Sequence, residues 1–452
     1  GVASDLGLAS DASAAEAMTR IDRFVCDIKE SQYGDGLHIY GRGDHGADEI
    51  KGLIKGLSGV RIDAGPSGSP YRGRQDIRPT GRNLFTTDPR SVPTRAGHAQ
   101  GVKMAEELVR RHLQEEGDYP RGLVVDLWGS ATMRTAGEEF AMALHLAGIT
   151  PQWDDGSERV SGFVVEPLAM LGRPRIDVTL RVSGLFRDIF PGLAGMFEQA
   201  VKALAARDEA PDFNPYLSEG ETTPRVFGPK PGSYGLEMGQ YLDDYTDEAR
   251  QMAGEAWLKA SEWAIAQDGS VTQNRAALEA QLNNVDAFVH VQDLAETDVL
   301  LAPDYVGHEA GVYAALKTLG KDAPALYHLD STRMDDPRAR TLTEEIARVV
   351  RARAANPSWA DGMMRHGFRG GAEIAATLDQ MAAFQHLSDT VPGHLFDQYF
   401  DATLGREDVL AFLDEHNPEA LQAMKDRFSA LLDAGLWKSR RNSIYADLEA
   451  LS

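Results

Sequence analysis

Residues 176–195 read IDVTLRVSGLFRDIFPGLAG, and this stretch predicts a strand that runs through a turn into a helix. Apolar and polar residues alternate from 178 to 182, as in a strand with one buried face. Ser183 is a favoured helix N-cap, and the apolar residues after it follow helical spacing. Backbone N–H groups at a helix start bind anions well. The stretch predicts an ordinary βα junction or an anion site that includes Ser183, Gly184 and Arg187.

The same alternation of strands and helices continues on both sides of this stretch. Strand patterns occur at 123–127, 162–168, 287–291 and 325–329, with helical patterns between them. We therefore predict an α/β fold with a mostly parallel sheet and flanking helices. Ligands of such sheets bind beyond the carboxyl ends of the strands. By that rule one crevice is predicted to contain the following side chains: Ser130, Thr132, Arg134, Ser183 and Arg187.

Length and pattern predict three regions, because 452 residues exceed what one core usually serves. Residues 1–120 form an N-terminal helix and strand segment that carries an Arg-, Gly- and Pro-rich loop at 61–97. Residues 121–335 form the α/β domain, with a helical insertion at about 200–283. Residues 336–452 form a helical C-terminal region.

Composition excludes several classes of protein. A net charge of −23 argues against nucleic-acid binding, which needs a basic face. No apolar run reaches the ~20 residues that cross a bilayer. Cys26 is the only cysteine, which excludes a disulfide framework and fits a reducing cytoplasm.

Arginines gather in the loop at 61–97, against the acidic balance of the whole chain. They stand singly among Gly, Pro, Thr and Asn, which favours a shaped loop that presents guanidinium groups to carboxylates over a disordered linker. The candidates for this role are Arg72, Arg74, Arg78 and Arg82. A second rigid polar loop, near 205–240, offers Arg225, Lys230 and Tyr234.

Several catalytic motifs are absent or weak. The chain has no Gly-x-x-x-x-Gly-Lys-Ser/Thr loop, no His-Glu-x-x-His pair and no Gly-x-Ser-x-Gly elbow. Gly41, Gly43 and Gly46 match a dinucleotide pattern only weakly, because the strand before them is short. Histidines and acids remain, and such groups can hold a divalent ion loosely or accept protons. The candidates are His38, Glu296, His308 and Glu309.

Longer segments resemble a known family. They include DRFVCDIKESQYGDGLHIYG (22–41), AGPSGSPYRGRQDIRPTGRNLFTTDPRSVPT (64–94), GLVVDLWGSATMRTAGEE (122–139), DVTLRVSGLFRDIFPG (177–192), RVFGPKPGSYG (225–235), ETDVLLAPDYVGHEAG (296–311), RTLTEEIARVVRARAANPSWADGMMRHGFRGGAEIA (340–375) and GLWKSRRNS (435–443). In this order they resemble the C-terminal part of the large subunits of the CobN and magnesium chelatase H family, over nearly the whole chain. GPSGSPYRGRQDIRPTGRN and GLWKSRRNS look more like the cobalt branch.

The resemblance implies a chelatase function. It implies ATP-dependent insertion of Co²⁺ into a corrin, hydrogenobyrinic acid a,c-diamide, during cobalamin biosynthesis. It also implies that separate AAA+ partners, CobS and CobT, hydrolyse ATP, in agreement with the missing P-loop. The corrin carries carboxylates, which gives the arginines a partner. Family members are more than twice this length, and an upstream His- and Glu-bearing motif is missing here, so we expect this chain to lack activity alone.

Alternatives remain open. The chain could be a docking platform for the AAA+ subunits, with corrin bound elsewhere, or it could belong to the magnesium branch and act on a porphyrin. On the first hypothesis, the carboxylate-holding residues are Arg72, Arg74, Arg78, Arg82, Arg187 and Arg225, with Lys230 and Tyr234 beside them. Ser183 and Gly184 supply backbone donors. His38, His308, Glu296 and Glu309 serve metal delivery or proton removal, with His38 and His308 as candidate metal ligands. Ala310 departs from the glycine that follows His-Glu in the family.

Overall fold

The computed structural model describes residues 16, 45–66, 77–85, 88–217, 222–439, 441 and 443–451. The chain divides into two compact units, with the boundary between Asp88 and Pro89. The predicted site residues His38, Arg72 and Arg74 lie outside the described residues.

In its described residues, the first unit contains helix α3 and a short parallel strand pair. Helix α3 spans His45–Leu57, and β1 (Gly65–Pro66) pairs with β2 (Asn83–Phe85). The helix contacts the chain before β2 closely, because a Cβ on Gly52 would lie 2.2 Å from the carbonyl oxygen of Gly81. This contact requires glycine at 52.

The second unit is built on an eight-stranded sheet in the order β12-β11-β10-β3-β6-β7-β8-β9. The strands from β11 to β7 run parallel, and β12, β8 and β9 pair antiparallel at the two edges. This confirms the predicted α/β class with a mostly parallel sheet. The bounds are β3 Gly122–Leu127, β6 Asp177–Val182, β7 Val226–Gly228, β8 Trp263–Ile265, β9 Val271–Gln273, β10 Ala287–Gln292, β11 Ala325–Asp330 and β12 Arg338–Thr341.

Alternating residues of the strands serve two separate cores. Leu123 and Val125 of β3 point to one face, where they pack with residues of α4 and α6. Val124 points to the other face, where it packs with residues of α10 and α13. Both faces of the sheet are therefore covered, which explains why its strands are nearly continuous apolar runs.

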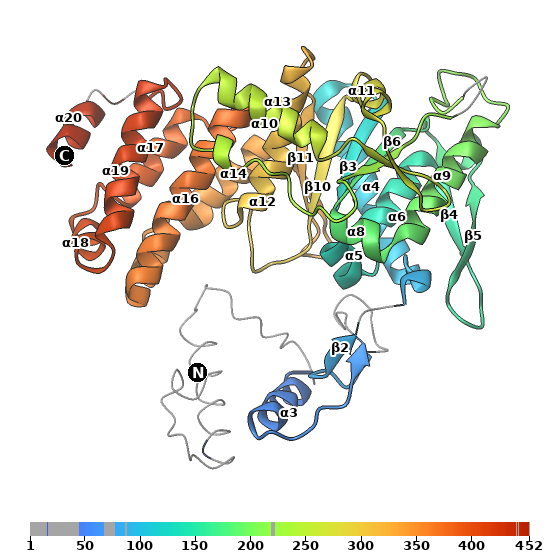
Figure 1. The fold of residues 1–452 in the computed structure, drawn as a ribbon, viewed down its shortest axis with the longest axis horizontal. Coiled ribbons are helices and arrows are strands. Elements are labelled where there is room, and N and C mark those ends of the chain that lie inside the picture. Colours follow the sequence, from blue (N-terminus) through green and yellow to red (C-terminus); the bar gives the residue numbers. More distant parts are fainter. Residues whose placement is uncertain are drawn as a thin grey trace. The chain divides into compact units, whose positions relative to one another are not determined.

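Helices connect the strands and cover both faces (Figure 1). Their bounds are α4 Arg95–Glu116, α5 Gly129–Thr135, α6 Glu138–Ala147, α7 Leu168–Leu171, α8 Gly184–Ile189, α9 Pro191–Ala205, α10 Asp247–Lys259, α11 Arg275–Leu282, α12 Pro303–Tyr305 and α13 Gly311–Thr318. A π-helix, Val306–Ala310, joins α12 to α13. Short 3₁₀ turns occur at Pro89–Ser91 and Gly239–Tyr241.

The C-terminal region is helical, as predicted. It contains α14 Leu342–Val349, a second π-helix at Val350–Ala354, α15 Pro357–Met363, a 3₁₀ turn at Met364–His366, α16 Gly367–Ser388, α17 Gly393–Ala402, α18 Glu407–His416, α19 Pro418–Asp433 and α20 Ile444–Leu451. These helices, orange to red in Figure 1, continue the core on the α10 and α13 face without a break.

One predicted strand lies outside the main sheet. The pattern at 162–168 corresponds to β5, Val160–Val165, which forms an antiparallel hairpin with β4, Ile149–Trp153. The turn after β5 and the short α7 then return the chain to β6. Within the described part of the chain, no helix is both long enough and apolar enough to cross a membrane.

Candidate functional site

A row of polar side chains crosses the sheet near the carboxyl ends of its central strands. In the strand register His328 pairs with His290, His290 with Asp126, and Asp126 with Arg181. Residues paired in this way point to the same face of a sheet. We call these four residues the polar row. They lie on the face of the sheet that the π-helix covers.

Asp126 is the centre of the polar row and is surrounded by donors. Its carboxylate lies 2.7 Å from Nε1 of Trp128 and 3.3 Å from Nη1 of Arg181. Nδ1 of His290 and Nδ1 of His308 each lie 2.9 Å from its Oδ2. A carboxylate has about four lone-pair positions, so four donors satisfy it completely.

These donors keep Asp126 ionised although its side chain is buried. Burial alone would raise the pKa of Asp126, but the charges and hydrogen bonds of His308, His290 and Arg181 hold the pKa well below its ordinary value. Burial also lowers the pKa of His308. At pH 7 the cluster therefore contains the Asp126 carboxylate beside the Arg181 guanidinium.

The neighbours of His308 determine which ring nitrogen carries its proton. Nδ1 lies 2.9 and 3.1 Å from the two oxygens of Asp126, so an unprotonated Nδ1 would turn its lone pair toward a carboxylate. Nη1 of Arg181 and Nε1 of Trp128 also lie near this nitrogen, at 2.9 and 3.2 Å, but both have Asp126 as an acceptor. We therefore assign the proton to Nδ1, which leaves the lone pair on Nε2.

The π-helix brings two consecutive side chains down onto the sheet. His308 reaches Asp126 of β3, and the next residue, Glu309, reaches His328 of β11 with 2.9 Å between Oε1 and Nδ1. π-Helices are rare and often occur at functional sites. The π-helix, which covers the polar row, is thus attached to the sheet at two points.

The contacts of His328 favour its cationic form. The amide nitrogen of Gln292 donates to the carbonyls of Leu294 and Thr297, so its Oε1 is the acceptor for Nε2 of His328 at 2.8 Å. Nδ1 faces Glu309, so both ring nitrogens have acceptors. Burial would lower the pKa of His328, but Glu309, together with Glu345 and Asp330, raises it above its ordinary value.

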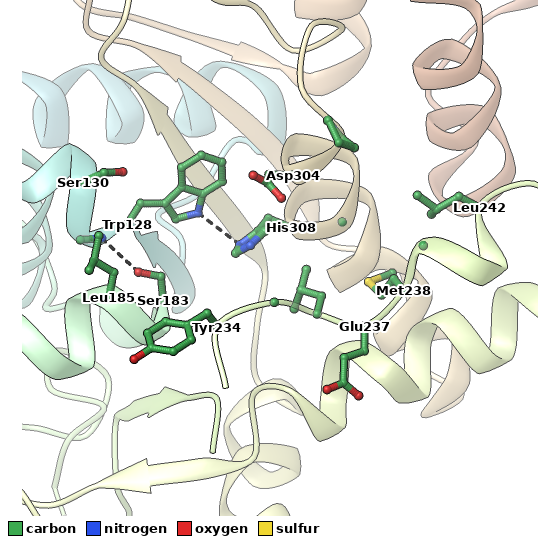
Figure 2. A pocket seen from close by; sticks show the side chains of 16 residues that line it. Trp128, Ser130, Ser183, Leu185, Tyr234, Glu237, Met238, Leu242, Asp304 and His308 are labelled. Carbon is green, nitrogen blue, oxygen red and sulfur yellow. Dashed lines mark hydrogen bonds between the residues drawn. The ribbon is translucent and has the colours of Figure 1, made fainter. Parts of the chain in front are cut away.

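A pocket of about 380 Å³ opens at the carboxyl ends of β3 and β6, beside this cluster. Trp128 and His308 form part of its wall, and Leu185, Tyr234 and Leu236 contribute apolar and aromatic surface. Figure 2 shows the indole of Trp128 next to His308, with Tyr234 on a loop that passes below them in that view. The pocket thus combines apolar and aromatic surface with an imidazole.

The predicted βα junction lines this pocket but offers no free anion site at Ser183. Ser183 caps α8, and its Oγ accepts hydrogen bonds from the backbone N–H groups of Phe186 and Gly129. Its own N–H donates to the carbonyl of Leu127. These groups therefore satisfy one another, and the use of Ser183 as a backbone donor to a ligand stays a prediction.

Gly184 has a packing role that its sequence position did not reveal. A Cβ there would lie 2.5 Å from the carbonyl oxygen of Ser233 and 2.8 Å from Cδ1 of Tyr234. Glycine therefore lets the loop at 229–235 lie directly on the start of α8. This contact places Tyr234 at the pocket.

Arg187 holds the same loop through hydrogen bonds to its backbone. Its guanidinium donates to the carbonyls of Pro229 and Lys230 at 2.8 and 2.7 Å and pairs with Asp188. The side chain is buried and does not line the pocket. The guanidinium also lies over the ring of Tyr234, and the carboxylate-binding role of Arg187 stays a prediction.

Arg225 lies at the opposite end of the sheet. It precedes β7 and forms a two-point ion pair with Asp177, the first residue of β6, at 2.6 and 3.1 Å. Both residues are at the amino ends of parallel strands, away from the pocket. The structure thus pairs Arg225 with Asp177, and its contact with a ligand carboxylate stays a prediction.

The other predicted residues are distributed as follows. Tyr234 and His308 both line the pocket. Glu309 does not line it, because its side chain is 1% exposed and faces His328. Lys230 is exposed and stacks over Trp263. Glu296 is exposed on the loop after β10 and does not line the pocket.

In the first unit, Arg82 donates to the carbonyls of Pro79 and Arg78, within its own loop. Arg78 is exposed. Their use as carboxylate ligands stays a prediction.

Sequence reasoning missed the centre of the site. Asp126, Trp128 and Arg181 were not predicted as functional, although a charged residue stands inside each of two strands that are otherwise apolar. That signal could have found them, because a buried charge needs a partner. In the described part of the chain, no group of three or more His, Cys, Asp or Glu side chains is arranged to hold a metal.

The fold and the site together define an α/β protein with a ligand pocket at the carboxyl edge of a parallel sheet, walled by aromatic residues beside a histidine–carboxylate cluster. Comparison with known sequences then identifies the family. A family model described as CobN/Magnesium Chelatase matches residues 42–444, and the chain belongs to this family.

Individual relatives agree with this assignment. The aerobic cobaltochelatase subunit CobN of Sinorhizobium is 41% identical over 424 residues, which cover 90% of this chain and 33% of that protein. The corresponding protein of Pseudomonas aeruginosa is 42% identical and covers 87% and 33%. The magnesium-chelatase H protein of Chlorobaculum parvum is 26% identical, covering 89% and 33%. The chain spans about a third of the length of these relatives.

A solved structure shares the fold. The catalytic subunit of cobaltochelatase from Mycobacterium tuberculosis superposes with a TM-score of 0.82 at 33% identity. The match covers the whole of this chain and 41% of that one.

Proposed function

We propose that this chain forms the macrocycle-binding and metal-insertion part of an aerobic cobaltochelatase large subunit. Its substrates on this proposal are Co²⁺ and a corrin, hydrogenobyrinic acid a,c-diamide. The observation that carries the proposal is the pocket that Trp128, Tyr234, Leu236 and His308 line together.

The walls of the pocket suit a flat macrocycle. Aromatic and aliphatic side chains bury the faces of such a ligand, and a few polar groups orient it. Trp128 is fixed by its hydrogen bond to Asp126 and by stacking on Tyr305 at 5.4 Å between ring centres. His308 then lies where it can meet a metal ion or a ring nitrogen.

The cobalt branch is favoured over the magnesium branch. The CobN relatives are 41% and 42% identical, whereas the magnesium-chelatase relative described above is 26% identical. The chemistry agrees, because imidazole is a good ligand for Co²⁺ while Mg²⁺ prefers oxygen.

The complete reaction needs more than this chain. On this proposal the assembly is a ligase that forms nitrogen–metal bonds in the cytoplasm, and AAA+ subunits of the CobS and CobT type hydrolyse ATP. The chain has no P-loop of its own. For this chain, which spans about a third of the length of its relatives, the proposed role is corrin binding.

Binding tests the proposal directly. Titration of the chain with metal-free corrin should quench tryptophan fluorescence, and Tyr234→Ala and Leu185→Ala should weaken binding about tenfold, as loss of a buried contact predicts. Met170→Ala is the matched control, because Met170 is 78% exposed and does not line the pocket.

Two results would contradict the proposal: no binding of corrin by the folded chain, or equal effects of the pocket variants and Met170→Ala. If the chain instead binds the AAA+ subunits but no corrin, the docking-platform alternative replaces it.

A further inference from the structure

Two side chains with metal-binding chemistry point into the pocket from one helical segment. Asp304 belongs to α12 and His308 to the π-helix that follows without interruption. Residues four apart on a helix lie on one face, with about 5–6 Å between Cβ atoms. Both residues line the pocket, and Figure 2 shows them on the same wall.

The two residues differ from their neighbours in the same segment. Tyr305 and Glu309 are buried, and the carboxylate of Glu309 is hydrogen-bonded to His328. Asp304 is exposed to the pocket. Nε2 of His308 has no hydrogen-bond partner among the residues that the structure describes, whereas Nδ1 is held by Asp126. Carboxylate, imidazole and a metal in this order form a recurrent arrangement in which the carboxylate orients the ring.

We propose that Asp304 and His308 form an entry site for the divalent metal substrate, in which a carboxylate oxygen and Nε2 hold the ion beside the bound macrocycle. This inference rests on the proposed function, because it names the position from which the metal is delivered. Asp126 acts here as a positioning residue, since it fixes the ring of His308 and does not touch the ion.

Two ligands suit a metal in transit. Resident structural and catalytic ions usually have three or four protein ligands, and no group of three exists in the described part of the chain. A two-ligand site leaves most coordination positions to water, which the ring nitrogens of a macrocycle can replace. When bonds to those nitrogens form, the bond to Nε2 breaks, and the freed Nε2 lone pair can take the proton that leaves a ring nitrogen.

Glu237 provides a matched control within the same pocket. It also lines the pocket with an exposed carboxylate, but it lies on the loop before α10 rather than on the helical segment of His308. An acidic pocket that attracts cations by charge alone would respond equally to the loss of either acid. A specific pair would respond to Asp304 only.

The experiment is a titration of the full chain with Co²⁺ in the absence of corrin, followed by visible absorption and by calorimetry. We expect Asp304→Asn and His308→Gln each to weaken Co²⁺ binding about tenfold or more, as loss of one of two ligands implies. Glu237→Gln should change the affinity less than about twofold. Asp304 is exposed, so Asp304→Asn tests the site even if His308→Gln disturbs the buried cluster.

The inference is overturned if Asp304→Asn binds Co²⁺ as the unaltered chain does, or if Asp304→Asn and Glu237→Gln lose the same affinity. Corrin titration without metal separates this inference from the proposed function. If the unaltered chain binds corrin but shows no Co²⁺ binding that depends on Asp304, the entry site alone is rejected. If it shows that Co²⁺ binding but binds no corrin, the proposed function alone is rejected.

Discussion

At the scale of single residues, Asp126 is a buried charge that four side chains contact. Asp126→Asn keeps the size of the side chain but leaves Arg181 buried beside a neutral amide that accepts fewer hydrogen bonds. Breaking a buried ion pair in this way costs about 3–5 kcal/mol. We expect a loss of that order in the free energy of unfolding, measured by urea denaturation with circular dichroism.

The control for this prediction is Asp304→Asn, which removes an exposed carboxylate and should change stability by less than about 0.5 kcal/mol. Equal stabilities of the two variants would show that Asp126 is not the centre of the cluster.

Glu139 gives a pH dependence whose direction is fixed by its surroundings. Burial, Asp293 and Glu138 raise the pKa of Glu139 to about 7, from an ordinary value of 4.5. Between these two values the folded state holds a proton that the unfolded chain has lost, so stability falls as pH rises through this window and is level above it.

Glu139→Gln should remove this loss. As the pH rises from 5 to 8, the free energy of unfolding of the variant should increase relative to that of the unaltered chain by on the order of 1–3 kcal/mol, measured by urea denaturation. Glu237→Gln, at an exposed acid, is the control. A difference between the chains that does not vary with pH would contradict the raised pKa.

At the scale of elements, the start of α8 controls the pocket through its glycine. Gly184→Ala would place a methyl group against Ser233 and Tyr234, so the loop at 229–235 must move. We expect a stability loss of about 1–3 kcal/mol, as in overpacked cores, and a weaker affinity for corrin. Thermal denaturation and fluorescence titration measure the two effects.

Gly192→Ala is the comparison, because a Cβ at Gly192 meets no atom within 4 Å and the position is helical. This variant should keep or raise stability. If Gly184→Ala behaves like Gly192→Ala, the loop does not depend on glycine at 184.

Elements also show where sequence reasoning succeeds. The strands near 123–127, 176–182, 287–291 and 325–329 were predictable because buried strands are short apolar runs between turns. The N-cap role of Ser183 was predictable from local chemistry as well.

Long-range contacts were not predictable from sequence. Arg187 and Arg225 were expected to meet a ligand, yet backbone carbonyls from 229–230 and the side chain of Asp177 occupy them. An arginine pattern gives no information about which acceptors the fold brings near. The π-helix was also missed, because its sequence has no distinctive period.

At the scale of the molecule, the C-terminal helices and the sheet share one core. Phe288 of β10 and Phe396 of α17 belong to the same continuous cluster of buried side chains. We therefore expect residues 89–452 to unfold in a single cooperative transition, although the sequence suggested a separate helical region from 336.

Two variants test this cooperativity. Phe288→Ala and Phe396→Ala should each shift the same single calorimetric transition to lower temperature. Each should lower the free energy of unfolding by about 3–5 kcal/mol, as expected for a fully buried phenylalanine. Two transitions, each lowered by one variant only, would show that the sheet and the helices fold separately.

The π-helix at Val306–Ala310 has a further consequence for the energetics of binding. His308 attaches it to β3 and Glu309 attaches it to β11, and β10 lies between these strands. A rotation of the segment about its own axis would break one of the two attachments. The orientation of this wall is therefore set during folding. When a ligand binds against the wall, the protein loses little conformational entropy, so less of the binding free energy is spent on ordering it.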